Sequence, residues 1–76
     1  MVYRLPSIGG KDLIKYLSKK CYKPTRQRGS HVVLRSEHDN RIVVVPLHDE
    51  LDRGTLLAIL EQAGIDRESF IREVRG

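Results

Sequence analysis

The sequence contains one cysteine and no tryptophan, its apolar runs are short, and each shortage excludes a class of protein. Because Cys21 has no second cysteine to pair with, no internal disulfide can form, and zinc motifs that need two cysteines are excluded. Apolar runs such as residues 42–45 are far too short to span a bilayer, and the first residues lack the apolar segment of a secretory signal. We therefore expect a cytoplasmic protein with no membrane partner, in a reducing compartment.

Charge, by contrast, is plentiful and unevenly distributed. Residues 1–35 carry nine Lys and Arg against one acidic residue, residues 36–76 carry five against nine, and together the halves give the net charge of +4. This polarised field favours an anionic partner, with nucleic acid the leading candidate and a solvated basic face without a partner the alternative. With 76 residues, 39% hydrophobic and 32% charged, the chain is expected to form one soluble domain over residues 1–76.

The first half of the chain predicts a helix followed by three strands. The helix is expected to begin near Lys11, and apolar residues recur at helical spacing after it: Leu13, Ile14, Leu17 and Cys21. The strands are expected over residues 22–28, 31–35 and 41–45, joined by turns at residues 29–30 and 37–40. Pro24 cannot donate to a strand ladder, so the first strand is placed at a sheet edge.

Two further helices are expected in the second half. Asp52 and Gly64 are suited to cap the start and the end of one helix, and Asp66 the start of a short last one that carries Phe70. The fold class is therefore α+β, in the order α-β-β-β-α with a short extra C-terminal helix. Short hairpin connections make the three-stranded sheet antiparallel, and both main helices should cover one face of it.

A basic run, a Gly-Ser turn and a histidine follow one another at residues 26–31. Gly29 can adopt backbone angles closed to most residues, so the chain can reverse there and begin a strand at His31. Strand alternation then sends residues 32 and 34 to one face and residues 31, 33 and 35 to the other. If the first face packs on helices, His31 lies near cations and water, where it could act on a phosphodiester. A lone histidine beside a turn is more often a surface or hydrogen-bonding residue, so both interpretations stay open.

Basic residues close to this turn are the candidate RNA contacts. Lysines recur four apart along the first predicted helix, and an ordinary solvated face is the alternative interpretation of such a stripe. Because they adjoin further basic residues in the sequence, one continuous basic surface is expected, with arginine supplying fork geometry and turn amides an anion nest. The residues predicted to contact RNA are Lys15, Lys19, Lys23, Arg26, Arg28, Gly29 and Ser30.

Three motifs in a fixed order resemble the HicA-type toxins, also described as YcfA-like mRNA interferases. They are Arg-Gly-Ser-His at residues 28–31, Pro-Leu-His at 46–48 and Arg-Gly-Thr-Leu-Leu-Ala-Ile-Leu at 53–60, and the resemblance covers nearly the whole chain. It implies a double-stranded-RNA-binding-domain-like fold and cleavage of mRNA without a metal or other cofactor, with His31 as the essential catalytic residue. It also implies neutralisation by a HicB-type antitoxin that covers the active site.

Two positions depart from the pattern of that family. The family commonly has glycine where Cys21 stands, and Gly9-Gly10 makes the approach to the first helix slightly longer than usual. Both departures concern turn geometry or packing rather than activity.

RNA supplies its own nucleophile, the 2′-hydroxyl, so the protein chiefly has to remove a proton and hold the phosphate. An imidazole, with an ordinary pKa of about 6.5, suits the first task. His48 is a candidate second histidine, although a loop residue that only forms hydrogen bonds is favoured, and His38 is expected to be solvated. No recognised metal-ligand spacing is present. Tyr16 and Tyr22 could stack on bases or pack in the core.

Two other functions fit the same observations. A non-catalytic RNA-binding module of the same fold would bind RNA in a salt-dependent manner and leave it intact. A protein whose basic surface serves only an acidic partner chain would have no affinity for nucleic acid at moderate salt.

Overall fold

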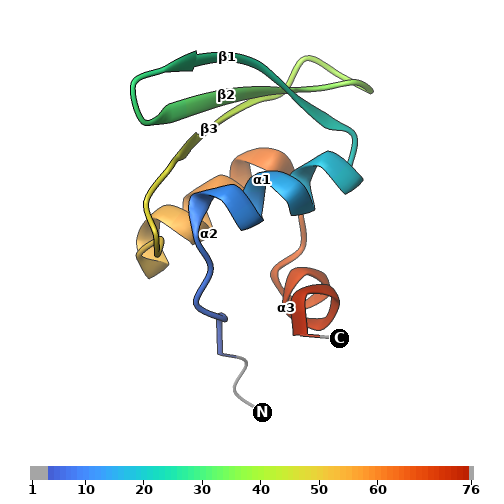
Figure 1. Ribbon diagram of the computed structural model, residues 1–76. Coiled ribbons are helices and arrows are strands. Elements are labelled where there is room, and N and C mark those ends of the chain that lie inside the picture. The colour runs from blue at the N-terminus through green and yellow to red at the C-terminus, as the bar shows by residue number, and fades with distance from the viewer. Residues whose placement is uncertain (1–3, 76) are drawn as a thin grey trace.

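The computed structural model describes residues 4–75, and its elements follow the predicted order. Three strands form an antiparallel sheet in the order β1-β2-β3, and the helices lie on one side of it (Figure 1). The α+β class, the sheet and the helical layer are therefore confirmed. The elements are α1 (Gly10–Lys19), β1 (Tyr22–Arg28), β2 (His31–Ser36), β3 (Ile42–Pro46), α2 (Arg53–Ala63) and α3 (Arg67–Arg75).

The core lies between the sheet and the helices because each element presents one apolar face to the other layer. Alternate residues of β2 and β3 are buried beneath the sheet: Val32, Leu34, Val43 and Val45. Leucines of α1 and α2, together with Phe70 of α3, pack in the same cluster. Each such side chain stabilises the fold by about 1.5–3 kcal/mol relative to full exposure, so these few contacts fix how the layers sit together.

Both tyrosines that could have stacked on bases are part of this core. Tyr16 is buried edge-to-face against Phe70 with ring centroids 4.9 Å apart, and its hydroxyl donates to Glu73 Oε1 at 2.6 Å. Burial, reinforced by that carboxylate, raises the pKa of Tyr16. The buried Tyr22 hydroxyl donates to the Ala63 carbonyl at 3.0 Å. Packing in the core is therefore the role that the structure shows for both rings.

The predicted helix caps are present. The Asp52 carboxylate accepts from the Thr55 amide at 3.1 Å, and Gly64 ends α2 in the left-handed region with φ 71°. The Asp66 carboxylate accepts from the Ser69 amide at 3.0 Å at the start of α3. The strand bounds differ from the prediction by a residue, since β2 continues to Ser36 and β3 runs over Ile42–Pro46.

Cys21 does not lie on the α1 stripe, so that part of the prediction is wrong. The helix ends at Lys19, and Cys21 is a half-buried turn residue with φ 69°, the one non-glycine residue with positive φ in the part of the chain described. The chain has to turn here because β1 runs back over α1. This left-handed backbone gives a physical reason for the glycine that the resembled family commonly has at this position.

No helix among the described residues is both long and apolar enough to cross a membrane.

Candidate functional site

The turn between β1 and β2 places His31 on the outer face of the sheet, away from the helices. Gly29 has φ 56°, and the Gln27 side-chain amide donates to the Gly29 carbonyl at 3.0 Å, which holds the turn from within. His31 begins β2, paired with Arg28 on one side and Pro46 on the other, and it is exposed. The predicted alternation of faces along β2 is confirmed, because Val32 and Leu34 are buried against the helices whereas His31 and Arg35 are exposed.

A bulge in β1 gathers its cations on that same outer face. The register shifts between Pro24 and Arg26, so that Lys23 pairs with Arg35, but Arg26 pairs with Val33. In an unbroken strand, residues 23 and 26 would point to opposite faces, and the extra residue reverses the alternation. Because paired residues share a face, Lys23, Arg26 and Arg28 all stand beside the outer side chains of β2.

The connection from β3 to α2, residues 47–52, joins the turn at residues 29–31, called here the histidine turn, to the first helix. The Leu47 amide donates to the Ser30 carbonyl at 2.6 Å, and the Gly10 amide donates to the next carbonyl of the connection, that of His48, at 2.9 Å. A Cβ on Gly10 would overlap the Pro46 carbonyl oxygen and lie 3.0 Å from the Leu47 Cα. Glycine is therefore required where α1 begins, and the unusual Gly9-Gly10 pair is explained by this close approach.

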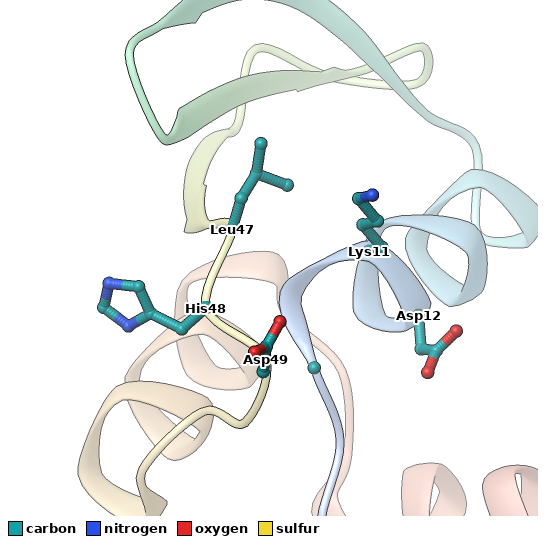
Figure 2. A pocket seen from close by; sticks show the side chains of 6 residues that line it. Lys11, Asp12, Leu47, His48 and Asp49 are labelled. Carbon is teal, nitrogen blue, oxygen red and sulfur yellow. The ribbon is translucent and has the colours of Figure 1, made fainter.

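A shallow hollow forms where these segments meet (Figure 2). It is lined by the start of α1 and by the connection, and Lys11 extends from α1 on the side towards Leu47 and the sheet. His48 is exposed, and its imidazole points away from α1. The backbone carbonyl of His48, rather than its ring, makes the contact with α1.

The lysine stripe of α1 runs away from the histidine turn. All three of its lysines are exposed. Lys11 lies at the hollow, whereas Lys19, two turns and about 12 Å further along the helix axis, lines a separate depression with Tyr16, Lys20 and Glu73. The sequence placed these lysines on one stripe, but only the packing of α1 against the connection shows which of them lies nearest to His31.

The cations of β1 differ in their partners. Lys23 forms an exposed ion pair with Glu37 at 3.2 Å, which contributes little to stability and leaves the lysine able to exchange partners. Within residues 4–75, no ion pair involves Arg26 or Arg28. Over the same span, no group of three or more His, Cys, Asp or Glu side chains could hold a metal ion.

The described residues thus form a small α+β fold with an exposed histidine paired with an arginine at the β1–β2 hairpin, in a chain of net charge +4. The model of a family described as the HicA toxin of bacterial toxin-antitoxin matches residues 10–65, which include α1 to α2 and every predicted site residue. The chain belongs to this HicA toxin family. Searches of the curated proteins and of the solved structures returned no match.

Proposed function

We propose that this toxin is an endoribonuclease that cleaves mRNA in the bacterial cytoplasm with His31 as its catalytic residue. The observation that carries the proposal is the position of that imidazole, exposed on the outer face of the sheet and paired across strands with Arg28. Membership of the HicA family, whose members are known as mRNA interferases, supports the same activity.

The reaction needs no nucleophile from the protein. The His31 imidazole takes the proton of a ribose 2′-hydroxyl, the 2′-oxygen attacks the adjacent phosphorus, and the bond to the 5′-oxygen of the next nucleotide breaks. The products are a 2′,3′-cyclic phosphate and a 5′-hydroxyl, whose proton comes from water or from a second acid. His48 is a candidate for that acid because its loop is bonded to the histidine turn. Positioned acid–base assistance of this kind is worth about 10²–10⁴ in rate.

The basic residues hold the substrate in this scheme. The unpaired guanidinium groups of Arg26 and Arg28 bind phosphate oxygens beside His31, and the amides of Gly29 and Ser30 add donors where the turn projects. Lys23 joins them when it exchanges Glu37 for a phosphate. Lys11 and Lys15 extend the positive field from the helical layer, with Lys19 the most distant contact.

The family also implies an antitoxin, and we propose one of the HicB type that covers the exposed histidine turn. Co-purification with the product of the adjacent gene, and recovery of RNA integrity when that product is added, would support this partner.

The proposed activity is tested by comparing wild type, His31→Ala and His38→Ala on end-labelled RNA in the presence of EDTA. His38 is the matched control because it lies exposed in the β2–β3 turn, at the other end of β2 from His31. We expect cleavage with cyclic phosphate ends by wild type and by His38→Ala, and a loss of about 10²-fold or more for His31→Ala. Equal cleavage by the folded His31→Ala protein would refute the assignment. RNA that is bound but left intact by wild type would instead indicate a non-catalytic RNA-binding module.

A further inference from the structure

The outer face of the sheet is organised in three rows that run across the strands. Each row has a cation on β1 and an apolar residue on β3, because the two registers align them through β2. The rows are Arg28–His31–Pro46, Arg26–Val33–Val44 and Lys23–Arg35–Ile42. One edge of the face is thus positively charged, the other is apolar, and the catalytic histidine sits in the first row.

The apolar edge of this face is unusual because two of its three residues, Val44 and Ile42, are exposed, whereas Pro46 is buried. Ile42 and Val44 expose 48% and 42% of their surface and are the large hydrophobic residues left open in the described part of the chain. The outward face of an antiparallel sheet is ordinarily polar when the other face packs on helices. Thr25, Arg26, Val33, Arg35 and Ile42 line a shallow depression on it.

We propose that this face binds single-stranded RNA and leads it to His31, with the phosphates along β1 and unstacked bases on Val33, Val44 and Ile42. The proposal rests on the function proposed above and names the form of its substrate. Successive rows lie two residues, about 6.8 Å, apart along β2 and β3, close to the step between phosphates of an extended polynucleotide, and the bulge in β1 keeps Lys23 in line with the third row.

Charge and shape favour a nucleic acid over a protein on this face. Among the ion pairs of the described residues, one involves a cation of these rows, and its carboxylate is Glu37, which pairs with Lys23. The face is therefore mainly positive, as a polyanion requires. Only unstacked bases can lie on apolar side chains, since a duplex presents phosphates and 2′-hydroxyls and keeps its base faces stacked inside. The guanidinium of Arg35, between Lys23 and Ile42 in the third row, contacts a phosphate in this arrangement.

The test measures binding without cleavage. A fluorescein-labelled 2′-O-methyl oligonucleotide of about ten nucleotides cannot be cleaved by the 2′-hydroxyl route, and its Kd is measured by anisotropy at several salt concentrations, single-stranded and as a duplex. Val44→Glu places a negative charge among the proposed bases, and Ala58→Glu makes the matched change at an exposed site of α2 in the helical layer. Arg35→Gln removes one cation from the face.

We expect the single strand to bind more tightly than the duplex. Val44→Glu should weaken single-strand binding about fivefold or more, since a like charge near a phosphate repels it, while Ala58→Glu stays within about twofold. Arg35→Gln should lower the slope of log Kd against log salt by about 0.7, the value of one lost phosphate contact on a single strand. If the Val44→Glu protein does not fold, the proposal is judged by the change that Arg35→Gln makes to the slope of log Kd against log salt.

Wild-type binding by both Val44→Glu and Arg35→Gln, or tighter binding of the duplex, would overturn the proposal. So would a Val44→Glu protein that binds RNA normally and loses only the antitoxin, because the face would then be a protein-docking surface. Cleavage of unmodified RNA by wild type is scored in parallel. If wild type cleaves RNA but the substitutions do not change binding, only the proposed single-strand binding face is refuted. If wild type does not cleave RNA at all, the proposed function is refuted.

Discussion

Replacing Gly10 with alanine should destabilise the protein, although alanine is the better helix former. Helix propensity alone favours Gly10→Ala by up to about 1 kcal/mol. The new methyl group, however, would overlap the Pro46 carbonyl oxygen, which belongs to backbone held between β3 and the Leu47–Ser30 hydrogen bond. The clash can be relieved only by moving α1 away from the connection.

The expected cost follows from what that movement breaks. Overpacking of a close contact costs about 1–3 kcal/mol, and loss of the hydrogen bond from Gly10 to His48 costs about 1 kcal/mol more. After the propensity gain is subtracted, the free energy of unfolding should fall by about 1–3 kcal/mol. In a domain of this size, each kcal/mol lowers the Tm by about 4–8 °C.

Gly54 is the matched control because it also lies in the first turn of a helix. A Cβ there would meet only Asp52 Oδ2, at an ordinary 3.4 Å, so Gly54→Ala should raise the free energy of unfolding by up to about 1 kcal/mol. Thermal and denaturant unfolding followed by circular dichroism measures both variants. Opposite signs are expected, and a Gly10→Ala protein as stable as Gly54→Ala would refute the close approach of α1 to the connection.

Two further predictions concern stability. Cys21→Gly should raise the free energy of unfolding by up to about 1 kcal/mol because it relieves a left-handed backbone, whereas Cys21→Ala, which keeps the φ of 69°, should not; urea titration separates them. Hydrogen bonds from the Thr55 hydroxyl and amide lower the pKa of Asp52, so its stabilisation is present above its unfolded pKa and lost as the pH falls through the folded value. Asp52→Asn should therefore lose less stability than wild type in acid, and identical acid unfolding curves would contradict this.

The caps and the histidine turn could be predicted from the sequence because their chemistry is local. Asp52 and Gly64 bond within their own helix ends, and Gly29 shapes a two-residue turn. Each depends on residues only a few positions away, so a pattern in one stretch is sufficient to identify it.

What the sequence could not predict depends on partners far along the chain. The bulge that turns Arg26 to the outer face is defined by the pairing of β1 with β2, and Pro24, which is equally typical of a sheet edge, does not by itself distinguish a bulge from an edge position. Cys21 continues the helical spacing of α1, and only the path of the chain into β1 removes it from the stripe. Gly10 looks like a weak helix start until Pro46, distant in sequence, is found against it.

The short link between the sheet and α2 constrains how chains of this kind can vary in length. Its adjacent residues 47 and 48 are bonded to different segments, and the Leu51 amide donates to the Ile8 carbonyl at 2.8 Å a few residues later. One inserted residue between positions 47 and 48 would pull either the hairpin or the first helix out of alignment with the other. Insertions should instead accumulate in the exposed turn at residues 37–40, where they would shift neither the histidine turn nor α1.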